Sequence, residues 1–198
     1  MSTISLPAGF DPQSCQLTLR TNQRVNASPF GGSEQAVDML NDRWIMDVDL
    51  ADTSQDNGAA IEAFIAAMRG QTNVVALYHF ARSVPRGTAR GTILLNGAVA
   101  QGASSIVVDG ISPSAGTILA GDVLGVGGQL LMAAADATAT GGGATITLVN
   151  RVRTALADNA AVTWSAPTAL FRMLSTTGVN YFRARASGPS FSFGEYIA

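Results

Sequence analysis

The sequence predicts a mainly β protein in which a small all-β module interrupts another β-rich unit that carries one helix. The main observation is the stretch 91–149, where short apolar runs are separated by Gly and Asp, with no basic residue and only three acids. All twelve arginines and the one amphipathic helix pattern lie outside this stretch. The N-terminal part has too few strands for a sheet of its own without the last thirty residues. We therefore predict one domain from residues 1–88 and 169–198, interrupted by an inserted domain at 89–168.

The composition favours a subunit of an oligomer. Of the 198 residues, 47% are hydrophobic and 13% are charged, which is little charge for an independent surface. We expect neighbouring copies to cover apolar surface; the alternative is a compact β protein whose Ala and Gly content raises the hydrophobic fraction. A formal net charge of −2 argues against a nucleic-acid-binding protein.

The N-terminal part is predicted to form strands. Residues 15–25 alternate in polarity, and residues 26–32 contain Pro and Gly and form a turn. Two further alternating runs, 34–40 and 43–51, are joined by Asn-Asp. This pattern predicts an antiparallel hairpin whose Trp44 face is buried.

One α-helix is predicted over about residues 55–69. Its apolar residues recur at helical spacing: Ile61, Phe64, Ile65 and Met68. Thr53 or Ser54 can cap its start, and Gly70 follows its end. The apolar run at 73–82 predicts a buried strand, and the Pro- and Gly-containing segment 84–91 predicts a linker.

Glycine-rich turns divide the central module into short strands. Asp109-Gly110 and residues 141–143 predict hairpin turns, and Gly127-Gly128 either turns the chain or bends a strand. A strand around Trp164 closes the module, which is a small barrel or a small sandwich. Three further strands are predicted after residue 168, and Phe191 and Phe193 alternate in the last one.

No group of residues predicts catalysis, a cofactor or a metal site. The one histidine, His79, lies in an apolar run, and the one cysteine, Cys15, has no partner for a disulfide or a thiolate metal site. Asp47, Asp49 and Asp52 form the only acid cluster, and they could hold Ca²⁺ or flank a glycosidic bond. No Ca²⁺-loop pattern accompanies them, so a solvent-exposed strand face opposite Trp44 explains them better. We expect a protein that is not an enzyme.

The sequence also predicts no signal peptide and no membrane span. The N-terminus lacks a basic region followed by an apolar stretch. The longest apolar run, 123–135, is too short to cross a bilayer and contains two glycines. We expect a soluble protein made in a reducing cytoplasm.

Five arginines are candidates for contacts between subunits. Arg82, Arg86 and Arg90 follow one another at intervals of four through the predicted linker, and Arg183 and Arg185 are predicted to share one face of a strand. Arginine suits interface ion pairs because its guanidinium binds a carboxylate with two hydrogen bonds. The alternative is a solvated hinge.

Several segments occur in an order that resembles a known family. They are Gln23-Arg24 in a strand, SPFGGSEQ at 28–35, NDRW at 41–44, IEAFIAAMRG at 61–70 and the apolar strand that follows. This order resembles the N-terminal region of the distal tail protein family of long-tailed (siphovirus-like) bacteriophages. The central segment 121–167 is similar to the β-barrel module often found inserted in phage tail-tip proteins.

The resemblance implies a fold and an assembly. It implies a β-sandwich belt domain with one helix, interrupted by a small OB-like barrel that projects outward. The belt domains would form a homo-hexameric ring in the virion tail tip, between the tail tube protein and the tail-tip hub or baseplate, after synthesis in the cytoplasm of a bacterial host. DNA would pass through the ring without specific binding, and no membrane would be involved.

Other functions remain open at this point. The chain could be a different tail-tip or tail tube subunit, or a carbohydrate-binding module. Trp164 is the one aromatic residue of the insert, which argues against a sugar-binding strip.

Overall fold

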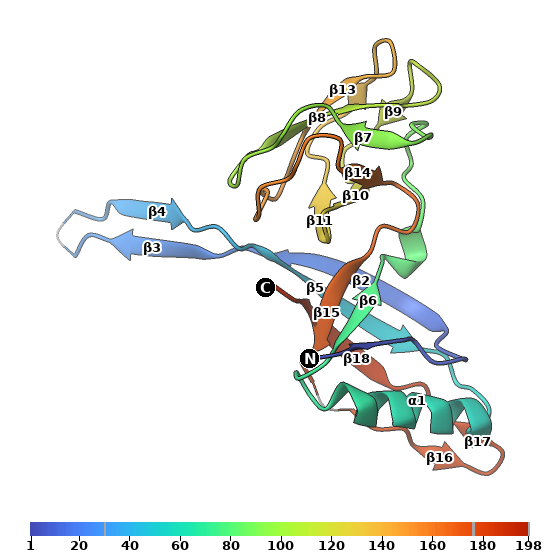
Figure 1. Ribbon diagram of the computed structural model, residues 1–198. Coiled ribbons are helices and arrows are strands. Elements are labelled where there is room, and N and C mark those ends of the chain that lie inside the picture. The colour runs from blue at the N-terminus through green and yellow to red at the C-terminus, as the bar shows by residue number, and fades with distance from the viewer. Residues whose placement is uncertain (30, 176, 198) are drawn as a thin grey trace.

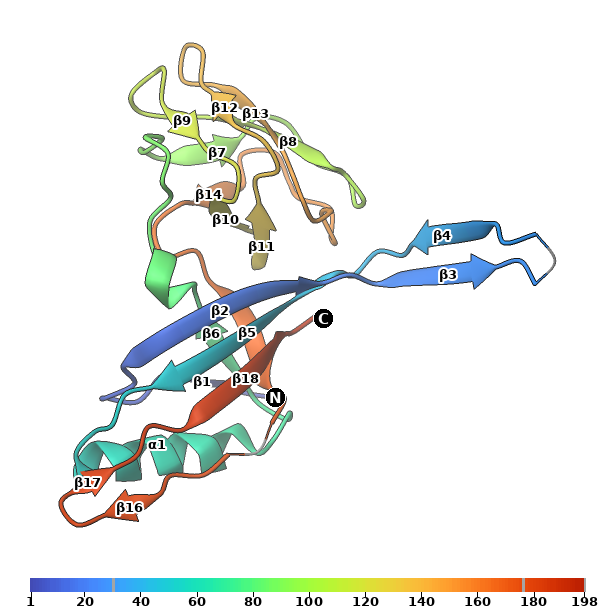
Figure 2. The same cartoon turned by 180° about the vertical axis from the view of Figure 1, so that it is seen from behind.

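The protein is mainly β, with 43% strand and one α-helix in the part of the chain described. The computed structural model describes residues 1–29, 31–175 and 177–197. Two six-stranded sheets lie one above the other in Figure 1, and a two-stranded arm extends sideways from the lower one. Figure 2 shows the same arrangement from behind.

The first sheet is built from both ends of the chain. Its strands are, in spatial order, β1 (Thr3–Ile4), β6 (Val74–Leu77), β15 (Ala169–Met173), β18 (Ser190–Glu195), β5 (Arg43–Leu50) and β2 (Pro12–Arg20). Side chains alternate across a strand, so one face is apolar: Trp44, Met46, Val48, Phe191 and Phe193 are all buried. The predicted burial of the Trp44 face is therefore confirmed.

The predicted helix is confirmed as α1 (Gln55–Met68), and it covers part of this apolar face. Ile61, Phe64 and Met68 are buried in one cluster with the core residues of the sheet. The Ser54 side chain accepts a hydrogen bond from the backbone N–H of Asn57 at 3.3 Å and caps the helix start.

The hairpin predicted over residues 34–51 is wrong. β5 pairs with β2 and β18, while the run before it, β4 (Glu34–Asp38), pairs with β3 (Gln23–Ala27). The chain reverses direction between β3 and β4, where the Ser28 N–H donates to the Ser33 carbonyl at 2.9 Å. Asn41-Asp42 instead connects β4 to β5 without reversing the chain. The strand predicted at 15–25 is interrupted at residues 21–22, next to this connection, and forms the two strands β2 and β3.

The strand predicted at 73–82 is also shorter than expected. β6 ends at Leu77, and a short 3₁₀ helix, η1 (Phe80–Arg82), follows it. The chain leaves the first sheet at this point. A hydrogen bond from the Arg82 N–H to the His79 carbonyl, at 2.9 Å, stabilises the 3₁₀ turn. His79 therefore lies between β6 and η1, immediately before the 3₁₀ helix, instead of in a strand.

The second sheet comes from the middle of the chain. Its strands are, in spatial order, β11 (Gln129–Met132), β10 (Val123–Val126), β14 (Ala161–Thr163), β7 (Ile93–Leu95), β8 (Ser105–Asp109) and β13 (Ala144–Thr147). The short strands β9 (Thr117–Ile118) and β12 (Ala137–Thr138) pair beside it. We call this sheet and its loops the second-sheet unit; it has its own core, which includes Leu95, Ile106, Leu131 and Ile146.

Two of the predicted turns are confirmed and one is not. Gly127-Gly128 joins β10 to β11 as a two-residue turn, since Val126 pairs with Gln129 and both glycines have positive φ. Thr140 likewise pairs with Gly143 across residues 141–142. Gly110 makes no hairpin, because β8 pairs with β7 and β13. A Cβ at Gly110 would lie 2.1 Å from the Thr92 carbonyl oxygen, so a close approach of two backbone segments explains the glycine.

Four strands follow residue 168 instead of three. Besides β15 and β18, the small hairpin of β16 (Tyr181–Phe182) and β17 (Arg185–Ala186) lies beside α1. Strand alternation in Phe191 and Phe193 is confirmed, because both side chains are buried.

Candidate functional site

The most unusual surface of the chain is the arm formed by β3 and β4. The two strands pair only with each other, and every residue in both is exposed. Val25 is 52% exposed and Val37 42%, and their register places them on opposite faces of the ribbon. A two-stranded hairpin alone is marginally stable in water. The arm therefore exposes both faces of its ribbon, each with one valine side chain.

Polar side chains fix the base of the arm. The Asn22 N–H donates to Asp42 Oδ1 at 2.8 Å, and the Asn22 side chain donates to the Leu40 carbonyl at 2.9 Å. Asn41 has φ 83°, a left-handed conformation that Asn tolerates better than most residues. These contacts set the direction in which the ribbon leaves the sheet.

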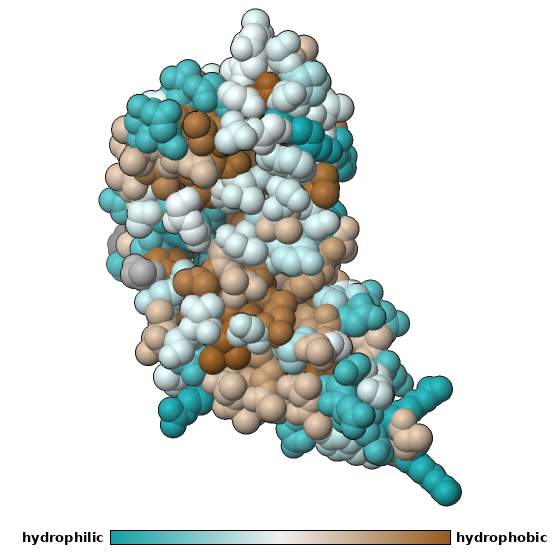
Figure 3. Space-filling view, turned by 45° about the vertical axis from the view of Figure 1, so that its right-hand side comes forward, coloured by the Kyte–Doolittle hydropathy of each residue, from teal (hydrophilic) through white to brown (hydrophobic). Residues whose placement is uncertain are grey.

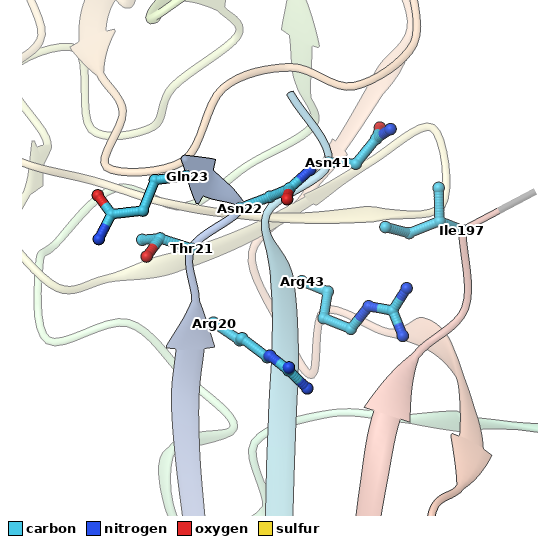
Figure 4. A pocket seen from close by; sticks show the side chains of 7 residues that line it. All are labelled: Arg20, Thr21, Asn22, Gln23, Asn41, Arg43 and Ile197. Carbon is cyan, nitrogen blue, oxygen red and sulfur yellow. The ribbon is translucent and has the colours of Figure 1, made fainter. Parts of the chain in front are cut away.

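An open polar cleft of about 670 Å³ lies at the same place. Figure 4 shows the residues that line it: Arg20, Thr21, Asn22, Gln23, Asn41, Arg43 and Ile197. Arg20 and Arg43 are directly opposite each other in the β2–β5 pair, and both extend toward the side of Ile197. Neither guanidinium has a hydrogen bond or an ion pair within the described residues. Like charges opposite each other destabilise a sheet, so this pair of arginines fits an anionic group from outside the chain.

A buried ion pair joins the two sheets. Arg153, from the second-sheet unit, donates to both carboxylate oxygens of Glu195 in β18, each at 2.6 Å. The side chains are 6% and 0% exposed. The Trp44 N–H also donates to Glu195 at 3.2 Å, and the Trp44 indole donates to the Leu130 carbonyl at 2.9 Å. These contacts hold the second-sheet unit against the apolar face of the first sheet, and the sequence pattern gave no sign of them.

Arg82 and Arg86 make contacts within the chain. The Arg82 guanidinium donates to the Gly121 carbonyl, and that of Arg86 donates to the Ala120 carbonyl at 2.6 Å. The backbone N–H of Arg86 donates at 2.8 Å to the buried carboxylate of Asp122. The predicted linker is thus held firmly against the second-sheet unit.

Arg90 is held in the same way. Its guanidinium lies over the Trp164 ring, 4.9 Å from the centroid, and donates to the Gly87 carbonyl at 2.8 Å. Contacts of Arg82, Arg86 and Arg90 with a neighbouring subunit stay a prediction.

The prediction that Arg183 and Arg185 share one face of a strand is wrong. Arg183 lies in the turn between β16 and β17, with Ala184 at φ 69°, and Arg185 begins β17. Both are exposed at the end of the molecule that carries α1, far along the chain from the arm. Their role at an interface is likewise untested.

The groups weighed for chemistry lie apart from one another. Asp47, Asp49 and Asp52 are exposed, and Asp47 and Asp49 lie on the face of β5 opposite Trp44, as predicted. In the described part of the chain, no three His, Cys, Asp or Glu side chains are grouped to hold a metal ion. Burial, and then the charge of Arg82, lower the pKa of His79.

A second groove, of about 420 Å³, lies beside the start of β2. Leu6, Phe10, Tyr78 and Phe80 give it aromatic and apolar walls. The Phe10 ring packs 5.7 Å from that of Phe80 and 6.0 Å from that of Phe64 in α1. Figure 3 looks at this side of the molecule and shows apolar surface across its middle, with hydrophilic surface at the α1 end.

The chain matches no protein-family model, and no curated protein matches it in sequence. Within the described residues no helix is long and apolar enough to span a membrane. Inferences about function therefore rest on the residues and their geometry.

Proposed function

We propose that the protein is a structural virion protein, a ring subunit like the distal tail proteins that join a phage tail tube to the tail-tip hub. The arm carries this proposal, because it presents backbone and apolar side chains that the chain itself leaves uncovered. A ribbon that extends from one end of a sheet suits a contact with the next copy in a ring. The order of motifs that resembles distal tail proteins supplies the expected six copies.

We also propose that the chain has the two-domain fold that the resemblance implies. The first sheet with α1 would be the belt, and the second-sheet unit would be the inserted OB-like barrel. In support, the end strands of the second sheet approach each other: Ala133 and Leu148 form a bridge, and the Val149 N–H donates to the Met132 carbonyl at 2.9 Å. A sheet whose end strands meet in this way curls around its own core.

The mechanism would be geometric. Arms and sheet edges would hold the copies around a channel, with one face of the ring toward the tube and the other toward the hub. The lining of the channel should be neutral or acidic, because a basic lining would retain the passing genome. A net charge of −2 agrees with such a lining.

Light scattering at several concentrations, together with electron micrographs of the purified chain, tests the proposal. We expect closed six-fold rings. A variant in which Asn-Gly replaces residues 24–37 should be monomeric and should still unfold cooperatively in a thermal melt. A wild-type chain that remains monomeric at high concentration contradicts the proposal; a trimer or an open tube points instead to another tail component.

A matched pair of variants isolates the arm. Val25→Thr/Val37→Thr should weaken assembly at least about tenfold, the effect of about 1.4 kcal/mol. Val107→Thr/Val149→Thr changes two valines of the second-sheet unit that are 42% and 48% exposed, and it should leave assembly unchanged. Equal behaviour of the two variants would show that the arm is not an assembly contact.

A further inference from the structure

We propose that Arg20, Arg43 and Arg172 of one copy bind Asp47 and Asp49 of the next copy, so that a basic end and an acidic end of the first sheet meet head to tail. This inference rests on the proposed self-assembly and adds the surfaces that meet. It concerns the open face of the first sheet, meaning the side chains of β2, β5, β15 and β18 that point away from the Trp44 face.

The basic end of the open face lies at the base of the arm. Arg20 and Arg43 have no partner within the described residues, as shown above. Arg172, on β15, lines a smaller cleft together with Arg43. Its guanidinium stacks 4.3 Å from the centroid of the Tyr196 ring, and its Nε is buried without a hydrogen-bond partner. Arg43 thus lies between Arg20 in one cleft and Arg172 in the next, and none of the three has an ion pair with a carboxylate of the described residues.

The acidic end lies further along β5. Asp47 and Asp49 are exposed, and neither has an ion pair in the described part of the chain. Polar residues flank them, and three of the four are serines: Gln16 and Ser192 lie opposite Asp47, and Ser14 and Ser190 lie opposite Asp49. The Ser14 hydroxyl donates to Asp49 at 2.7 Å. Small neighbours leave room above the carboxylates for long side chains from another chain.

The two ends cannot neutralise each other within one chain. Arg43 and Asp47 are four residues apart on one strand, which corresponds to about 13 Å. A second copy can supply the missing partner to each end. Because the two surfaces that meet are different, the contact is heterologous, and it closes into a ring if the rotation from copy to copy allows closure.

The arm supports the same direction of assembly. It extends beyond the basic end of the sheet, as Figures 1 and 2 show. A neighbour whose acidic end docks at Arg20 and Arg43 would therefore lie next to the arm. Nucleic acid is the less favoured occupant, because Asp47 and Asp49 lie on the same sheet face and the chain has a net charge of −2.

Reversing the charges tests the inference. Arg20→Glu/Arg43→Glu and Asp47→Arg/Asp49→Arg should each weaken assembly at least about tenfold, the effect of about 1.4 kcal/mol. An equimolar mixture of the two variants should assemble again, because each contact then joins opposite charges. Asp56→Arg and Arg69→Glu change exposed charges on and next to α1, and they should assemble like the wild type.

The possible outcomes separate the two proposals. If the wild type assembles and both reversed variants do so equally well, this inference is wrong and the proposed function stands. If the wild type never assembles, the proposed function itself fails. If Arg20→Glu/Arg43→Glu keeps its mass but loses binding to labelled double-stranded DNA that the wild type shows, the arginines form a phosphate site and the inference is wrong. Circular dichroism checks that each variant is folded.

Discussion

The ion pair between Arg153 and Glu195 gives the sharpest prediction, because it lies where the two sheets meet. Arg153→Met removes the guanidinium but keeps much of the side-chain volume. Glu195 then keeps two weaker backbone donors, the N–H groups of Trp44 at 3.2 Å and Leu130 at 3.5 Å, and loses both bonds of 2.6 Å. A buried carboxylate is left without a counter-charge.

The expected cost follows from that geometry. Removing one partner of a buried ion pair destabilises a protein by about 3–5 kcal/mol. The two remaining backbone donors favour the lower part of this range, so we expect a loss of about 3 kcal/mol. Removing both charges, in Arg153→Met/Glu195→Met, should recover most of it, because apolar replacements of a buried pair are often neutral or stabilising.

Urea unfolding followed by circular dichroism measures these free energies. The double-mutant cycle should give a coupling energy of at least about 2 kcal/mol between Arg153 and Glu195. Arg151→Met is the control, since the ion pair of Arg151 with Asp38 is half exposed and such pairs contribute less than about 1 kcal/mol. If Arg153→Met costs no more than Arg151→Met, the buried pair does not hold the sheets together.

Two further predictions concern single residues. Burial and the charge of Arg82 lower the pKa of His79 below 6.5, so the unfolded chain takes up a proton at a pH where the folded chain does not. Stability should be fully present above pH 6.5 and should fall as the pH drops below it, and His79→Gln should flatten that dependence in unfolding curves recorded across this range. A Cβ at Gly188 would lie 1.9 Å from the Leu50 carbonyl oxygen, so Gly188→Ala should cost about 3 kcal/mol in a thermal melt. Gly178→Ala meets nothing within 4 Å and should stay within about 0.5 kcal/mol of the wild type; equal losses would refute the steric argument.

Local periodicity predicted the elements better than it predicted their partners. The helix and the buried face around Trp44 were correct, because both depend on which side chains share a face within one segment. The hairpin at 34–51 failed, because alternation says which residues are buried but not which strand lies alongside. The sequence offered two turn signals, at residues 26–32 and at Asn41-Asp42. The strand pairing places the reversal of the chain between β3 and β4, not at Asn41-Asp42.

The candidate site shows the same limit. Arg20 and Arg43 are neighbours only through the register of β2 and β5, and Arg153 and Glu195 are 42 residues apart. No spacing rule connects such residues, so a sequence pattern could not have singled them out. Arg82, Arg86 and Arg90 were chosen for their spacing along the chain. In the structure, Arg82 and Arg86 bind carbonyls of residues 120–121, and Arg90 binds carbonyls of its own segment.

The chain leaves and re-enters the first sheet at two neighbouring strands, so the segment between them can be exchanged for another. Leu77 at the end of β6 and Ala169 at the start of β15 are paired neighbours, so the intervening 78–168 begins and ends about 5 Å apart. A short turn could close that gap at little entropic cost, and so could any compact unit whose two ends lie close together. Trp44 and Glu195 set the conditions, because the Trp44 indole N–H and the Glu195 carboxylate are both buried and both bonded to residues of this segment. A replacement would have to supply a cation to this carboxylate, or Glu195 would have to change with it.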